Sequence, residues 1–218
     1  MGSGNHEAKA RIIEGYFSDL ERRVRVLPEL YDAGYPDEAL LVCCCYIEGM
    51  GGNLYWPDEG IARNFVRVLE EYGGEEILWH IHPKQLCESF QAIRGLRVLG
   101  LKLAATFDAE DHRLRSREEV VRHVTGPLTS DEIARLRQEA WRGTLANLVY
   151  ARIRCQLVHN LSAAPLLLSK TTLRGESVPT LDFHLLYGPL CRTLEGVTNL
   201  SIRSNAFFGH DPWPPRDD

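Results

Sequence analysis

The stretch that decides the fold runs from Thr129 to His159 and reads TSDEIARLRQEAWRGTLANLVYARIRCQLVH. Thr129 and Glu132 have capping-box spacing, in which each side chain accepts a hydrogen bond from a backbone N–H at the start of a helix. No proline follows within the stretch, and its one interior glycine, Gly143, is tolerable in a helix. We therefore expect one long helix from Thr129 to about His159.

Helical spacing recurs before this stretch. Residues 7–32 carry apolar side chains about 3.6 positions apart, which predicts a long amphipathic helix closed by Gly34. A second, apolar helix is expected to open at Pro36 and to reach about Met50, where glycines break it. Three further helices are expected, over 59–72, 83–101 and from the capping box at Ser116 to about 126.

Alternating strand patterns are scarce, so we expect an all-α fold, a bundle of long helices with a short irregular C-terminal region. Residues 180–204 predict a last helix or a short strand followed by a helix. The length and the 44% hydrophobic content favour a single helical domain over 1–218, with loose tails at 1–6 and 207–218. No run of about 20 apolar residues occurs, so no membrane span is expected.

The six cysteines lack the spacing of zinc sites or disulfide frameworks, and three of them are consecutive, Cys43 to Cys45. We expect them to be small buried hydrophobes in a reducing, cytoplasmic protein. The net charge of −5 argues against a broad, non-specific nucleic-acid binder but leaves room for a local basic cleft. Several arginines of the long helix, Arg135, Arg137, Arg142, Arg152 and Arg154, predict either such a patch or a solvated face.

Arg154 and His159 stand near the end of the expected long helix. At about 100° per residue they flank opposite edges of its apolar stripe, about 140° apart. On spacing alone, Arg and His in a last turn are ordinary C-terminal residues that bond the last carbonyls. The spacing therefore leaves a structural and a functional interpretation open.

The phrase Arg154-Cys155-Gln156-Leu157-Val158-His159-Asn160 resembles the signature of the HEPN (higher eukaryotes and prokaryotes nucleotide-binding) superfamily. That signature is an Arg, four to six residues and a His, where an apolar late helix ends. Residues 46–52 and 63–69 also look like one bacterial branch of the superfamily. The resemblance implies an HEPN-like helical bundle that acts as a homodimer. One Arg and one His do not supply both the general base and the general acid of a full acid–base cycle, whereas two copies of the motif do.

Membership would imply a metal-independent RNA endonuclease in a bacterial toxin or phage-defence setting, with an antitoxin or defence-system protein as a further partner. His159 would move the proton of the RNA 2′-hydroxyl and Arg154 would hold the phosphate, giving 2′,3′-cyclic phosphate and 5′-hydroxyl ends. No cofactor is expected. Many members carry Asn, Asp or His directly after the Arg, where this chain has Cys155. The alternative is a non-catalytic nucleotide- or RNA-binding or protein-interaction module.

Three further residues are candidates for support of this pair. Glu48 lies in the apolar second helix and needs a partner there, either Arg154 or His159 or a local group at the helix end. Gln156 and Asn160 are hydrogen-bonding side chains beside the motif. His80 and His82 have a metal-ligand spacing, but no third ligand is recognisable nearby, so no metal site is expected.

Overall fold

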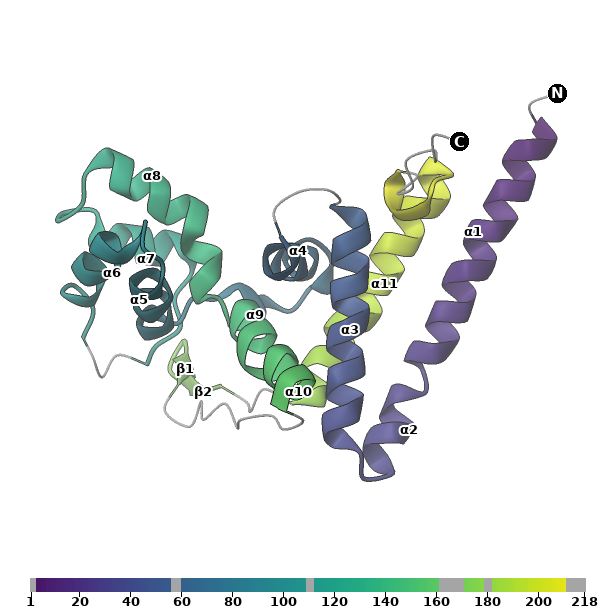
Figure 1. Cartoon of the computed structure of the whole chain (residues 1–218), viewed down its shortest axis with the longest axis horizontal. Coiled ribbons are helices and arrows are strands. Elements are labelled where there is room, and N and C mark those ends of the chain that lie inside the picture. The colour runs from purple at the N-terminus through teal and green to yellow at the C-terminus, as the bar shows by residue number, and fades with distance from the viewer. Residues whose placement is uncertain (1–2, 56–59, 109–111, 161–170, 179–181, 211–218) are drawn as a thin grey trace. The chain divides into compact units, whose positions relative to one another are not determined.

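The computed structural model describes residues 3–55, 60–108, 112–160, 171–178 and 182–210, and it is an all-α helical bundle with one tiny two-stranded sheet (Figure 1). The predicted fold class is confirmed. The chain divides into two compact units. Unit 1 comprises Met1–Gly74, Arg154–Ala163 and Asp182–Asp218, and unit 2 comprises Glu75–Ile153 and Ala164–Leu181. Compact units can still fold together, so the single helical domain stays a prediction.

Unit 1 is built around three long helices. In Figure 1, α3 and α11 run side by side, and α11 also packs against α1. The bounds of the elements of unit 1 are α1 Ser3–Val24, α2 Leu27–Asp32, α3 Pro36–Leu54, α4 Ile61–Val68, the π-helix η1 Leu69–Gly73, α10 Cys155–Asn160, α11 Phe183–Ser204 and the 3-10 helix η5 Phe207–Gly209.

The expected helix over 7–32 is two helices, so that prediction is wrong in its middle. α1 ends at Val24, and α2 begins at Leu27 with Pro28 in its first turn. Proline lacks the N–H that a continuous helix needs and disfavours helical backbone at the residue before it. Gly34 adopts a φ of +93°, as its predicted role at the end of this segment requires.

α3 continues through its glycines, against the prediction that they break it. The helix opens at Pro36 as expected but runs on to Leu54. A Cβ atom at Gly51 would lie only 2.6 Å from the carbonyl oxygen of Asn64 in α4. Gly51 therefore serves the close approach of two helices rather than a helix end.

The C-terminal part of unit 1 is mostly helical from Phe183 to Gly209. α11 begins after the N-cap Asp182, whose side chain accepts a hydrogen bond from the N–H of Leu185, and it continues through Pro189. Phe208 is buried and packs edge-on against Phe17, so the expected loose tail does not begin at 207. Residues 211–218 of that expected tail lie outside the described residues. The expected N-terminal tail, 1–6, overlaps α1.

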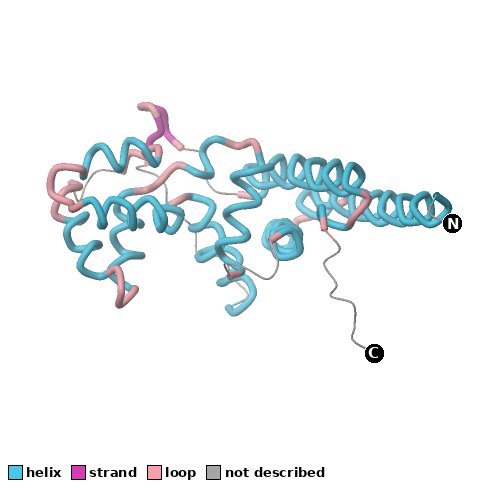
Figure 2. Tube along the Cα trace, turned by 90° about the horizontal axis from the view of Figure 1, so that it is seen from above, coloured by secondary structure: helices cyan, strands magenta, loops and turns pink. Residues whose placement is uncertain are grey.

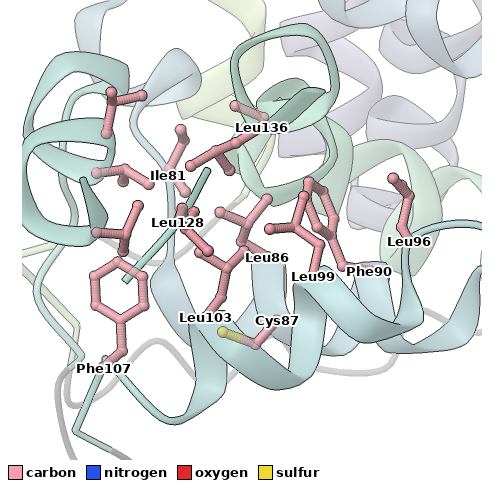
Figure 3. Close-up of a cluster of buried hydrophobic side chains, with 14 residues drawn as sticks. Ile81, Leu86, Cys87, Phe90, Leu96, Leu99, Leu103, Phe107, Leu128 and Leu136 are labelled. Atoms are coloured by element: carbon pink, nitrogen blue, oxygen red, sulfur yellow. The ribbon is translucent and has the colours of Figure 1, made fainter. Parts of the chain in front are cut away.

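Unit 2 consists of short helices around one apolar core. Their bounds are η2 Glu76–Trp79, α5 Pro83–Ala92, α6 Arg97–Ala104, α7 Arg117–Val124, α8 Ser130–Glu139, η3 Ala140–Gly143 and α9 Leu145–Leu148, and the π-helix η4 Val149–Arg154 follows. Figure 3 shows Leu86 and Phe90 of α5 and Leu99 and Leu103 of α6 turned into this core. The expected single helix over 83–101 is thus two helices.

Both predicted capping boxes are confirmed. Ser116 and Glu119 exchange the two reciprocal hydrogen bonds at the start of α7, and Thr129 and Glu132 do so at the start of α8. These local signals need only a few neighbouring residues, which is why the sequence predicts them well.

The single helix expected from Thr129 to His159 is wrong, because α8 ends at Glu139 and the chain is extended at Thr144 (φ −70°, ψ 154°). Thr144 pairs with Ile81 of another extended segment, and the N–H of Leu145 donates to the carbonyl of His80. These bonds from a distant segment replace the helical bonds that the local sequence favours.

Extended backbone in unit 2 is short and irregular. Strands β1, Thr172–Leu173, and β2, Glu176–Ser177, pair antiparallel, and they are the strands coloured in Figure 2. Isolated bridges join Ile81 to Arg115 and Arg113 to Thr172. Among the described residues, none of the helices is both long and apolar enough to cross a bilayer.

Candidate functional site

The motif occupies a π-helical segment and the helix that follows it. Arg154 is the last residue of η4, and Cys155 to Asn160 form α10, which packs against α3 (Figure 1). π-helical turns are rare in proteins, and those that do occur often lie at functional sites. The break at Thr144 and the wider π-helical turn shift the angular positions of the later residues, so angles counted along one unbroken helix do not apply here. The placement of Arg154 and His159 at opposite edges of an apolar stripe stays a prediction.

Arg154 is held by Glu48 of α3. The Nε atom of Arg154 lies 2.6 Å from Oε2 of Glu48, and its Nη2 donates a hydrogen bond of 2.8 Å to Oε1. Each side chain is 20% exposed. The guanidinium therefore donates one hydrogen bond to the carboxylate, through Nη2, and its Nε makes a close charged contact with the second oxygen without hydrogen-bond geometry.

This ion pair satisfies the requirement that the sequence poses at Glu48. A carboxylate in an apolar helix needs a partner, and among the described residues Arg154 forms an ion pair with Glu48. Of the partners expected from the sequence, namely Arg154, His159 or a local group at the helix end, Arg154 is in contact with Glu48. Whether Glu48 also orients the catalytic groups stays a prediction.

The environment of the pair disfavours thiolates. Burial raises the pKa of the Cys44 thiol well above its usual range, Glu48 raises it further, and the positive charge of Arg154 partly opposes the shift. Cys45 of α3 is exposed overall, but the partial burial of its thiol and the charge of Glu48 likewise raise its pKa. Both sulfurs therefore carry their protons at neutral pH, which excludes them as thiolate nucleophiles there.

The six cysteines are all free. Cys43, Cys44 and Cys87 are buried, as the sequence predicts, whereas Cys45 is exposed. Cys155, next to the motif Arg, is half-buried on α10.

The remaining motif residues are described only in part. Gln156 is half-buried on α10. His159 and Asn160 are the last residues of α10, and their side chains lie outside the described part of the chain. The structure thus brings Glu48 to Arg154, and it places the backbone of His159 on the helix that begins directly after Arg154.

The His-x-His segment of unit 2 is part of the core packing. His80 and His82 are 6% and 5% exposed, and Nδ1 of His80 lies 2.8 Å from the carbonyl oxygen of Glu76. The rings of His82 and His112 meet edge to face, 5.7 Å apart between centroids. Within the described residues, no group of three His, Cys, Asp or Glu side chains is placed to hold a metal ion.

Comparison of the chain with models of known protein families, with curated proteins and with solved structures yields no match. The resemblance to the HEPN superfamily therefore rests on the residues 154–160, 46–52 and 63–69 themselves.

Proposed function

We propose that this protein is a metal-independent RNA endonuclease of the HEPN type, with Arg154 and His159 as its catalytic residues. The observation that carries the proposal is the ion pair of Arg154 with Glu48, beside a π-helical turn and at the start of the helix that carries His159. A guanidinium fixed by a carboxylate and an imidazole carried by the helix that follows it are the residue types that RNA transesterification needs.

RNA supplies its own nucleophile in this reaction. His159, or its copy in a second chain, takes the proton of the 2′-hydroxyl as the 2′-oxygen attacks the adjacent phosphorus. The bond from phosphorus to the 5′-oxygen breaks, and that oxygen receives a proton from the other copy of His159, which leaves a 2′,3′-cyclic phosphate and a 5′-hydroxyl. Arg154 stabilises the charge on the phosphate oxygens, and its plane is set by Glu48.

One His cannot act as base and acid at the same time, so we propose a homodimer in which two copies of the motif border one cleft. The setting that fits such an activity is the bacterial cytoplasm, in a toxin or phage-defence system. An antitoxin or another defence protein would then be a partner that restrains the nuclease.

A second function is favoured by the same ion pair. Glu48 already balances the charge of Arg154, so an RNA phosphate would have to share that guanidinium with a carboxylate. Cys155, a poor hydrogen-bonding side chain, stands where many members of the superfamily have Asn, Asp or His. Both features suit a non-catalytic nucleotide- or RNA-binding or protein-interaction module.

Cleavage of total RNA by the purified protein in EDTA decides between the two functions. We expect cleavage that persists with chelator, and ends that carry 2′,3′-cyclic phosphate. His159→Ala and Arg154→Ala should each abolish it, whereas Arg152→Ala, an exposed arginine two positions earlier, should not. Thermal melting of each variant separates loss of chemistry from loss of folding.

Several outcomes would contradict the nuclease proposal. Full cleavage by the His159→Ala or Arg154→Ala protein would remove the motif from the mechanism, and loss of activity in EDTA would show that a metal is needed. A dimer that binds RNA but leaves it intact at high protein concentration would identify the binding module instead.

A further inference from the structure

We infer that a hollow on the surface of unit 2, between α7 and α8, is a binding site for phosphate groups. We call it the arginine hollow. Its volume is about 580 Å³, in the range of small-molecule sites. It is lined by Arg117, Glu118, Val121, Arg122, Thr125 and Arg137.

The helices that carry these side chains are firmly placed. Glu118, Arg122 and Thr125 recur at helical spacing and so share one face of α7. α7 is fixed by its capping box and by Val120 and Val124, which are fully buried in the core beneath it. α8, which contributes Arg137, packs against α7 and starts at its own capping box. The arginines therefore project from a fixed backbone, which lowers the entropy cost of binding a ligand.

The hollow concentrates positive charge in a chain whose net charge is −5. Three arginines line it, Arg117, Arg122 and Arg137, against one acidic residue, Glu118. The side chains of Arg122 and Arg137 form no ion pair and no hydrogen bond with any residue that the structure describes. Other arginines of the same unit are neutralised locally, for example Arg142, whose Nε lies 2.8 Å from the carboxylate of Glu139. Like charges held together in this way repel one another, and an anion between them would relieve the repulsion.

Phosphate is the anion that this arrangement suits best. Each guanidinium presents paired N–H donors whose spacing matches two oxygens of a phosphate, and three of them suit a ligand with more than one phosphate group. Val121, 8% exposed, gives the hollow an apolar floor. The Thr125 hydroxyl donates to the carbonyl of Val121, so towards a ligand it acts as an acceptor.

The ligand phosphates come from a free polyphosphate, including a nucleoside polyphosphate, or from the backbone of an RNA strand. The recognition chemistry is the same for both. The inference goes beyond RNA cleavage, because the hollow shares no residue with the Glu48–Arg154 pair and binding is measured without turnover.

The test is calorimetric titration of the full chain with inorganic tripolyphosphate and, separately, with a short single-stranded RNA in a His159→Ala background that prevents cleavage. Arg122→Gln/Arg137→Gln should weaken binding by about tenfold or more, and should reduce the slope of log K against log salt by about two. The matched control is Arg97→Gln/Arg135→Gln, which removes the same charge from exposed arginines of unit 2 outside the hollow. It should change affinity less than twofold.

A variant that should gain affinity completes the test. Glu118→Gln removes the one carboxylate that lines the hollow and should strengthen binding by about two- to fivefold. A loss confined to tripolyphosphate identifies a free ligand, and a loss confined to RNA identifies a strand. Equal losses in the hollow variant and in the control, or no binding of either probe, would overturn the inference, while RNA cleavage by the wild-type protein would be unaffected by that result.

Discussion

α3 and the segment from Thr129 to Asn160 are both helix-forming stretches with glycine inside, yet they behave differently. α3 passes through its glycines without interruption, whereas the second stretch is a 3-10 helix over Ala140–Gly143 and becomes extended at Thr144. At Gly51 the missing side chain admits the backbone of α4, and at Gly143 it admits Leu86 of α5. Whether a helix continues through a glycine thus depends on which atoms pack against that glycine more than on the low helix propensity of glycine.

The two stretches meet at the candidate site, because Glu48 lies on α3 and Arg154 lies on the second stretch. The largest expected effect is therefore at this contact. Glu48→Gln keeps the shape of the side chain but removes the charge that orients Arg154. We expect RNA cleavage to fall by about 10- to 100-fold, the usual cost of losing a group that orients a site residue.

The matched control is Glu38→Gln, an exposed carboxylate in the first turn of the same helix, which should retain full cleavage. Glu48→Gln should also lower the free energy of unfolding by about 1–3 kcal/mol, because Arg154 keeps its charge in a site that is only 20% exposed. An unchanged rate together with this loss of stability would make the pair purely structural.

The second effect tests the break at Gly143. A Cβ atom there would lie 2.6 Å from Cβ of Leu86 and 3.0 Å from Cγ2 of Ile81, both in the core of unit 2. We expect Gly143→Ala to destabilise the protein by about 2–3 kcal/mol in urea denaturation, as overpacking of a core does. A neutral substitution would show that the extended pairing of Thr144 does not depend on this contact.

The sequence predicts the features that depend on neighbouring residues, and it does not predict those that depend on residues far apart in the chain. The capping boxes at Ser116 and Thr129 are complete within four residues, so they can be read directly. The break at Thr144 depends on Ile81, a residue far away in the chain, and no local pattern carries that information. Local propensity favours a helix at Thr144, but hydrogen bonds to the distant segment at Ile81 hold the backbone extended instead.

The candidate site shows the same division. The need of Glu48 for a partner is visible in the sequence, and so is the motif that supplies Arg154, but the angular argument that joined Arg154 to His159 assumed an unbroken helix. The arginines of that assumed helix are in fact divided: Arg142 pairs with Glu139, Arg154 with Glu48, and Arg137 faces the arginine hollow.

The third effect is a difference in stability between alanine substitutions at two consecutive glycines of α3, Gly51 and Gly52. Gly51→Ala would bring a Cβ atom to 2.6 Å from the backbone oxygen of Asn64, whereas a Cβ at Gly52 meets nothing within 4 Å. We expect Gly51→Ala to lower the free energy of unfolding by about 1–2 kcal/mol, because the gain in helix propensity offsets part of the overlap. Gly52→Ala should raise it by about 0.5–1 kcal/mol. Equal signs for the two variants would refute the close approach of α3 and α4.

The smallest effect concerns the start of the second stretch, where prediction and structure agree. Thr129 accepts a hydrogen bond from the N–H of Glu132, and its own N–H donates to the Glu132 carboxylate. Thr129→Ala should therefore cost about 1 kcal/mol of stability, and Thr129→Ser, which keeps the hydroxyl, should cost almost nothing. Because this cap acts on α8 before the break at Gly143, neither variant should alter RNA cleavage. A parallel loss of cleavage in Thr129→Ala would mean that α8 and the motif respond as one helix, as the sequence alone suggests.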